Sequence, residues 1–120
     1  MTRFASEALR DLRDRNEIAI HTEKHPDSAV IIWVVVADDE VFVRSVRGAR
    51  GRWYRDLATG GFAMLDLGGR RLAVQAVPVA DPAAIDRASR EYLRKYRSSP
   101  YAQPMVKADV LPTTLRLEPR

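Results

Sequence analysis

The first residues follow the periodicity of an amphipathic helix. One face carries four apolar side chains at helical spacing, namely Ala5, Ala8, Leu9 and Leu12. Charged residues fill most of the remaining positions of this stretch. The pattern predicts a helix over residues 5–13, within an N-terminal segment of residues 1–16 that packs against the rest of the chain.

The middle of the chain changes to the period of two that is typical of β-strands. Five short runs of apolar or alternating residues predict strands at residues 17–22, 30–37, 41–45, 62–67 and 71–79. The second run is apolar on both faces, which favours a central position in a sheet. Three short segments between the runs predict turns: EKHPDS at 23–28, the Asp38 and Asp39 pair, and the Gly68 and Gly69 pair.

The last third of the chain carries a clear helix-start signal. Asp81 can cap the first free amides of a helix, and Pro82 suits the first helical position. They predict a late helix over residues 83–97. Three prolines make residues 97–112 an irregular connection, and alternating leucines predict a closing strand at residues 113–117.

Taken in order, these elements predict a single α+β domain spanning residues 1–120. Consecutive short strands with tight turns favour antiparallel pairing over βαβ units. Closing the sheet on itself removes exposed edges. We therefore expect a six-stranded antiparallel split β-barrel with flanking helices.

Composition narrows the class of protein. Apolar residues make up 46% of the chain and charged residues 30%, which are values of a globular protein. The absence of cysteine excludes a disulfide framework and a cysteine nucleophile. The longest apolar run, residues 29–37, is far too short to span a membrane, and the charged N-terminus does not resemble a secretory signal. We expect a cytoplasmic protein without a membrane partner.

The densest chemistry lies in residues 44–57, RSVRGARGRWYRDL. Five arginines precede the first acid of the stretch, and the chain as a whole carries a net charge of +4. Arginine matches phosphate and carboxylate groups with paired donors, and glycines let backbone amides approach an anion closely. Trp53 and Tyr54 add flat rings. A phosphate-bearing aromatic ligand would suit this loop, but a solvated basic loop with Trp53 filling the core explains the same residues equally well.

Other candidate chemistry is weaker. Thr22 and Lys24 could form the second half of an anion clamp if the strands bring them near the arginines, although an ordinary turn is the simpler interpretation. His21 and His25 lie four positions apart without a suitable third ligand, so no metal site is predicted. No residue has the surroundings of a catalytic acid, base or nucleophile, and the catalytic residues stay unassigned.

Three motifs, IWVVV, VRSVRGxxGRWYR and TTLRLxPR, are shared with a known family. Residues 17–120 resemble domain of unknown function 2255, an uncharacterised group of small bacterial proteins. That group is in turn similar to the flavin-binding split β-barrels, above all to the deazaflavin-dependent reductases. The resemblance implies FMN or a deazaflavin as cofactor, a homodimer with the cofactor at its interface, and a small oxidoreductase as the corresponding class of enzyme.

The resemblance also implies a set of binding residues. Phosphate contacts fall to the cations, hydrogen bonds and backbone contacts to the small residues, and ring or interface packing to the aromatics. The cofactor-binding residues expected on this basis are Thr22, Lys24, Arg44, Ser45, Arg47, Gly48, Trp53 and Tyr54.

Two alternatives from other classes stay open. A non-catalytic module could use the basic loop to bind nucleic acid or another polyanion. Because no nucleic-acid motif accompanies the arginines, a phosphorylated aromatic small molecule is the better partner. A ligand-free structural barrel is the second alternative, and it is favoured by the turn EKHPDS, which contains no glycine.

Overall fold

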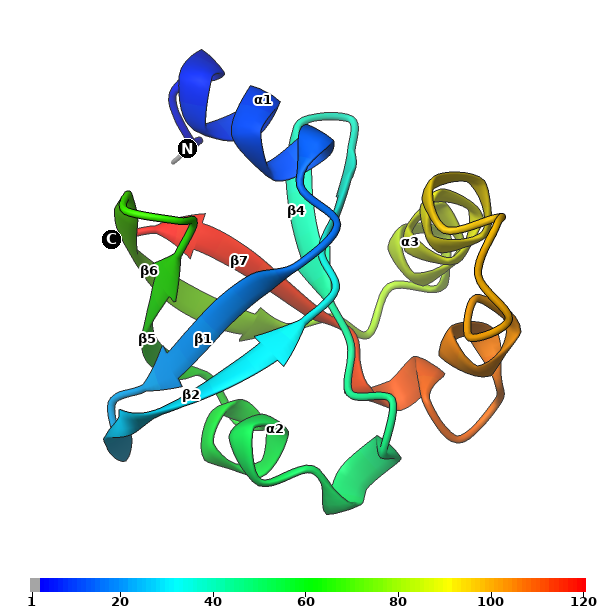
Figure 1. Cartoon of the computed structure of the whole chain (residues 1–120). Coiled ribbons are helices and arrows are strands. Elements are labelled where there is room, and N and C mark those ends of the chain that lie inside the picture. The colour runs from blue at the N-terminus through cyan, green and yellow to red at the C-terminus, as the bar shows by residue number, and fades with distance from the viewer. Residues whose placement is uncertain (1–2) are drawn as a thin grey trace.

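Seven strands form one antiparallel sheet in the computed structural model, which describes residues 3–120 (Figure 1). Residues 1 and 2 of the predicted N-terminal segment lie outside the described residues. The strands are β1 (Ile18–Thr22), β2 (His25–Ile32), β3 (Val35–Ala37), β4 (Glu40–Val43), β5 (Gly61–Asp66), β6 (Arg71–Pro78) and β7 (Leu115–Pro119). The α-helices are α1 (Ser6–Asp14), α2 (Arg52–Leu57) and α3 (Pro82–Lys95).

The strand order is β2-β1-β5-β6-β7-β4-β3, with every neighbouring pair antiparallel. The sheet is strongly curled (Figure 1), and its two edge strands, β2 and β3, are consecutive in the chain. Trp33 and Val34 alone separate them. The predicted α+β class and the curled antiparallel sheet are confirmed, but the strand count of six is wrong because the run at 30–37 forms two strands.

Two side chains at the C-terminal end of α3, those of Lys95 and the capping residue Tyr96, explain why this run breaks at Val34. Its amide donates to the hydroxyl of Tyr96 at 3.2 Å, and its carbonyl accepts from the ammonium of Lys95 at 2.7 Å. Buried backbone groups need partners, and here a helix provides them in place of a neighbouring strand. The chain can therefore leave one edge of the sheet and join the other within two residues.

The turn after β1 is shorter than the predicted segment at 23–28. Thr22 already pairs with His25, so β2 begins within the polar sequence EKHPDS. Pro26 is tolerated because β2 is an edge strand, where one side of the backbone needs no strand partner. A proline and polar composition thus concealed the first residues of a strand.

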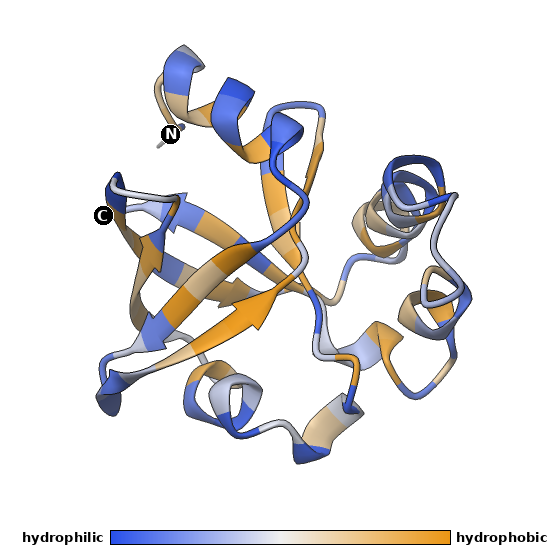
Figure 2. Ribbon diagram, viewed as in Figure 1, coloured by the Kyte–Doolittle hydropathy of each residue, from blue (hydrophilic) through white to orange (hydrophobic). Residues whose placement is uncertain are grey.

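The main core fills the inside of the curled sheet, and Figure 2 shows apolar residues distributed along its strands. In Figure 1, α1 lies over one end of the barrel and α2 under the other. Leu12 of α1 and Leu57 of α2 are both at most 1% exposed and belong to this core. A second core lies between α3 and the outer face of β3 and β4, where Phe42 packs against Tyr92 and its neighbours.

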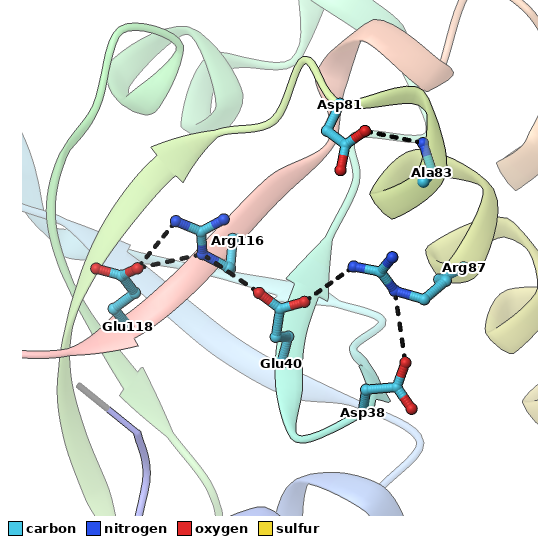
Figure 3. Close-up of polar contacts among 7 residues, drawn as sticks. All are labelled: Asp38, Glu40, Asp81, Ala83, Arg87, Arg116 and Glu118. Atoms are coloured by element: carbon cyan, nitrogen blue, oxygen red, sulfur yellow. Dashed lines mark hydrogen bonds and ion pairs between the residues drawn. The ribbon is translucent and has the colours of Figure 1, made fainter. Parts of the chain in front are cut away.

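A chain of ion pairs fastens α3 to the sheet (Figure 3). Arg87 of α3 lies 3.1 Å from Glu40 and 3.6 Å from Asp38, and Glu40 also faces Arg116 of β7 at 3.9 Å. Glu118 continues the alternation at 3.0 Å from Arg116. Partly exposed pairs of this kind each contribute only about 0–1 kcal/mol, so the network orients α3 more than it stabilises the fold.

The closing strand begins two residues later than predicted. The hydroxyls of Thr113 and Thr114 donate to the carbonyls of Val110 and Leu111, each at 2.7 Å. Such local bonds compete with strand pairing. They close a short 3₁₀ turn, Leu111–Thr113, and β7 starts at Leu115.

Candidate binding cavity

A cavity of about 530 Å³ opens between the end of β2 and the arginine-rich segment. Its lining comes from β2 and the following link, from residues 44–53, and from the irregular connection after α3. The residues are Glu17, Val30, Ile31, Ile32, Trp33, Arg44, Ser45, Val46, Arg47, Gly51, Arg52, Trp53, Tyr101 and Met105. Both tryptophans of the chain are among them.

Trp33 gives the cavity a fixed aromatic surface. Its ring stacks on Tyr96 with centroids 3.8 Å apart and planes within 2° of parallel. The Tyr96 hydroxyl reaches the carbonyls of Asn16 at 2.6 Å and of Val34 at 3.1 Å. Burial raises the pKa of Tyr96 to about 12, so this hydroxyl stays a donor at neutral pH. The stack on Tyr96 therefore fixes the orientation of the Trp33 ring in the absence of a ligand.

The mouth of the cavity is unusually apolar for a protein surface. Three large apolar side chains stand out as strongly exposed among the described residues, and all three line this cavity: Ile31 at 61%, Val46 at 56% and Tyr101 at 66%. Contiguous exposed apolar surface marks a site that binds a ligand or a partner. Their convergence at one cavity separates this region from the rest of the surface.

Cations stand beside the apolar wall. Arg47 is exposed, and Arg52 is partly exposed at the start of α2. Glu17 is the one acid in the lining, which also contains a third arginine, Arg44. An anionic group at the cavity would meet a positive surface on the side of residues 44–53.

The Arg44 side chain points into the protein, where it has a structural role. It is 1% exposed, and its guanidinium donates to Thr114 Oγ1 at 2.9 Å and to the carbonyls of Met105 at 3.0 Å and Ile85 at 2.8 Å. It also lies 5.3 Å from the centre of the Tyr92 ring. Burial lowers the pKa of Arg44 below its ordinary value. Its donors link the end of β4 to α3, to the connection after α3 and to the residue before β7, so this guanidinium is engaged by the protein itself, whereas Arg47 is exposed.

Ser45 and the glycines shape the floor of this segment. The amide of Ser45 donates to Thr113 Oγ1, and its carbonyl accepts from Gly48 at 2.9 Å. Gly48 has a φ of +64°, a conformation that glycine adopts without strain. A side chain at Gly51 would place its Cβ 2.5 Å from Ser45 Oγ, so glycine is needed for this close approach. Gly48 supports the loop but does not line the cavity.

Thr22 and Lys24 lie elsewhere. The Thr22 hydroxyl is buried and donates to Asp56 Oδ2 at 2.7 Å. Lys24 borders a separate cavity of about 330 Å³, together with Glu23 and Asp56. The structure thus does not bring the β1–β2 turn to the arginine-lined cavity, and the two halves of the expected clamp stay apart.

Trp53 and Tyr54 separate in the same way. Trp53 lines the cavity with part of its surface and packs into the barrel core with the rest. Tyr54 packs against the core, and its hydroxyl donates to the carbonyl of Pro112 at 3.4 Å. Of the eight predicted residues, four line the cavity: Arg44, Ser45, Arg47 and Trp53.

Sequence reasoning missed the apolar half of the site. The end of β2 was predicted as the start of a central strand, whereas it is an edge strand with Ile31 exposed. Met105 and Tyr101 come from the proline-rich connection, which has no periodic signal. Arg52 belongs to the arginine-rich segment 44–57, but it is not among the cofactor-binding residues expected from the sequence.

A family model for uncharacterised proteins conserved in bacteria, DUF2255, matches residues 8–117. The chain belongs to the DUF2255 family. A comparison with functionally curated proteins gave no match.

Three solved structures share the fold of this DUF2255 chain. The conserved hypothetical protein Rv2991 of Mycobacterium tuberculosis matches with a TM-score of 0.62 and 15% identity, over 97% of this chain and 79% of its own. ChuZ of Campylobacter jejuni matches with a TM-score of 0.67 and 9% identity, over 95% of this chain and 52% of its own. HutZ, the heme storage protein of Vibrio cholerae, matches with a TM-score of 0.65 and 13% identity, over 98% of this chain and 91% of its own. The DUF2255 chain therefore spans about half of ChuZ.

These structures correct the expected cofactor. The ligand named for a neighbour of this fold is heme, in HutZ, and the prediction of FMN or a deazaflavin is wrong. The geometry agrees with this correction, because Thr22 and Lys24 lie away from the cavity and Arg44 is turned inward. At such low identity, the likeness establishes the fold alone.

Residues 3–120 contain no helix that is both long and apolar enough to cross a membrane. These residues also contain no group of three or more histidine, aspartate or glutamate side chains arranged to hold a metal ion.

Proposed function

We propose that this protein binds a flat, largely apolar small molecule that carries an anionic group, phosphate or carboxylate, in the cavity beside Trp33. The observation that carries the proposal is the joint placement of the exposed apolar side chains, both tryptophans and two accessible arginines around one cavity. Pockets with a mostly apolar lining and a few placed polar groups are the usual form of small-molecule sites.

The two parts of the lining give the ligand an orientation. A ring system lies against Trp33 and the apolar end of β2, and the anionic group lies toward Arg47 and Arg52. Arginine suits either anion because its planar fork donates two parallel hydrogen bonds. The similarity of fold to a heme storage protein supports ligand binding in general.

Heme meets only part of this description. Its ring and its carboxylates match the apolar wall and the arginines. The iron finds no imidazole or thiolate in the lining, where Met105 and Tyr101 are the side chains with iron-binding chemistry. His21 and His25 lie at the β1–β2 hairpin, in which His25 contacts Asp56. The cavity therefore does not provide histidine ligation of a heme iron, and the proposal concerns the class of flat anions.

A pair of fluorescent probes tests the proposal. The sulfonate 8-anilinonaphthalene-1-sulfonate is a flat aromatic anion, and N-phenyl-1-naphthylamine is its uncharged counterpart. We expect the anion to bind the purified protein more tightly than the uncharged probe and to quench the tryptophans. Protoporphyrin IX and hemin, titrated in the same way, separate binding of the ring from binding through iron. Absence of binding by every probe would contradict the proposal.

Matched variants locate the site. Arg47→Ala should weaken binding of the anionic probe while leaving the uncharged probe unaffected. Arg90→Ala is the control, because Arg90 is an exposed arginine on α3 paired with Asp86. A short single-stranded oligonucleotide in the same assay tests the nucleic-acid alternative, which predicts salt-sensitive binding that competes with the probe.

The apolar mouth of the cavity also favours the predicted homodimer. Ile31 lies on the edge strand β2, and Val46 and Tyr101 border the same opening. A second copy covering these side chains would remove them from water. Light scattering of the wild-type chain and of Ile31→Lys tests this: a dimer that becomes a monomer in the variant supports the interface, and a monomeric wild type contradicts it.

A further inference from the structure

One carboxylate oxygen joins the β1–β2 hairpin to α2. Asp56 Oδ2 accepts from Thr22 Oγ1 at 2.7 Å, from His25 Nδ1 at 2.6 Å and from Arg52 Nη1 at 3.2 Å. Thr22 and His25 stand on either side of the β1–β2 turn, and Arg52 precedes Asp56 by one turn of α2. The Asp56 side chain is only 9% exposed. The bonds from Thr22 and His25 connect the hairpin to the helix that carries Arg52.

Three donors on one oxygen compete with one another. A carboxylate oxygen offers about two lone-pair sites. The threonine and histidine bonds are short, whereas the arginine bond is the longest of the three. Arg52 is also 36% exposed in its side chain. Arg52 is therefore the donor that leaves Asp56 most easily.

Arg52 is also the member of this group that lines the binding cavity. Neither Thr22, His25 nor Asp56 belongs to that lining. A guanidinium held by Asp56 has part of its charge neutralised and some of its donors occupied. A guanidinium released from Asp56 can offer them to a ligand anion. The hydrogen bonding of Asp56 thus affects the cavity through the side chain of Arg52.

The charge of His25 can change the strength of its hydrogen bond to Asp56 and so the competition with Arg52. Its side chain is 45% exposed, and histidine is the side chain that commonly gains a charge between pH 5 and 8. A neutral imidazole can donate to Asp56 through Nδ1–H, but a protonated one makes a shorter, charge-assisted bond. Burial opposes ionisation of Asp56, yet hydrogen bonds from Thr22 and His25, with the charges of His25 and Arg52, hold its pKa below the ordinary value. Asp56 therefore stays an acceptor throughout this range.

The other charged groups near this carboxylate do not reverse the effect. Glu23 and Lys24, on the turn, border the smaller cavity with Asp56 and are opposite in sign. His21 on β1 directs its Nδ1 to the carbonyl of Pro26 at 3.1 Å. Arg55, the remaining cation of α2, is exposed.

We infer that Asp56 is a positioning residue for Arg52, and that protonation of His25 releases Arg52 toward the anionic group of a ligand in the cavity. The inference rests on the proposed function and adds its regulation: anionic ligands bind more tightly at pH 5.5 than at pH 8.

The test uses 8-anilinonaphthalene-1-sulfonate, whose sulfonate keeps its charge over this range. For the wild-type chain we expect at least a threefold lower Kd at pH 5.5 than at pH 8. His25→Gln should bind equally at both pH values. Asp56→Asn, in which Arg52 is free at any pH, should bind tightly at both, and Arg52→Gln should bind weakly at both. The uncharged N-phenyl-1-naphthylamine should show no dependence on pH.

His21→Gln is the matched control, because it removes the other histidine of the chain and should keep the pH dependence of the wild type. Circular dichroism melts establish which variants are folded, and His25→Gln, an exposed substitution, gives the result even if Asp56→Asn is unstable. A pH dependence that survives in His25→Gln, or disappears in His21→Gln, would overturn the inference. Failure of the probe to bind at any pH would contradict the proposed function instead.

Discussion

Trp33 and Tyr96 lie face to face, with ring centroids 3.8 Å apart, where the chain passes from one edge of the sheet to the other. Trp33 faces the cavity, and Tyr96 follows the last residue of α3. The two rings bury their facing surfaces against each other, so each restricts the orientation of the other. The same pair therefore supports the strand break and the wall of the candidate site.

Tyr96→Phe should lower the free energy of unfolding by about 1–3 kcal/mol, because the amide of Val34 loses its partner in a buried position. The ring stack stays, so probe binding should change little. Tyr96→Leu removes the stack as well and should weaken binding of both naphthalene probes. Urea unfolding and probe titration measure the two effects. Tyr101→Phe, at an exposed tyrosine, is the control for stability.

Arg44 and Arg47 should behave as different kinds of residue despite their shared loop. Arg44→Met removes a donor from Thr114 Oγ1, from the carbonyl of Met105 and from the partly buried carbonyl of Ile85, and should cost at least about 3 kcal/mol of stability. Arg47→Ala should leave the melting temperature nearly unchanged and weaken the anionic probe. Thermal melts and probe titrations on both variants check this. A large loss of stability in Arg47→Ala would show that this arginine, too, is structural.

Lys95 should make stability depend on pH. Burial, followed by the charge of Arg94, lowers the pKa of Lys95 to about 8 from an ordinary value of 10.5. Between these values the unfolded chain binds more protons than the folded one, so the contribution of Lys95 to stability rises with pH. The free energy of unfolding of the wild type minus that of Lys95→Met should therefore increase from pH 7.5 to pH 9.5. Lys107→Met, at an exposed lysine, is the matched control for removing one lysine.

Thr22 should prove to be a structural residue. Its hydroxyl donates to Asp56 and accepts from the amide of His25 at 3.2 Å. Thr22→Val should therefore destabilise the fold by about 1–2 kcal/mol, while Thr22→Ser, which keeps the hydroxyl, should cost less. Hydrogen exchange of the β1–β2 hairpin and urea unfolding measure the change. Equal stability of Thr22→Val and the wild type would contradict the role assigned to this contact.

Much of the fold was predictable because its elements carry local signals. The alternation at Ile18 and Ile20, and the capping pair Asp81 and Pro82, are read from a few neighbouring residues. The break at Val34 is different, since its hydrogen-bond partners lie 61 and 62 positions away on the chain. No periodicity within the run could reveal it.

The candidate site depends even more on contacts between residues that are distant in the sequence. Arg44 and Arg47 have similar sequence surroundings, but the acceptors that hold Arg44 inward, among them the carbonyls of Met105 and Ile85, lie far away in the sequence. The partner of Thr22 is Asp56, which lies within the arginine-rich segment 44–57, but nothing in the sequence places α2 against the β1–β2 turn. Charge clustering located one wall of the cavity, and the apolar wall emerged only with the fold.

The two-residue link between β2 and β3 has a mechanical consequence. The outermost strands of the sheet are joined by covalent bonds, so the barrel cannot spread along this side without first pulling Val34 away from Tyr96 and Lys95. The seam that lacks strand-to-strand hydrogen bonds is thus held by the chain itself. Lengthening the link by a few glycines would convert a fixed seam into a hinge, and Trp33, which lies within it, would lose its orientation.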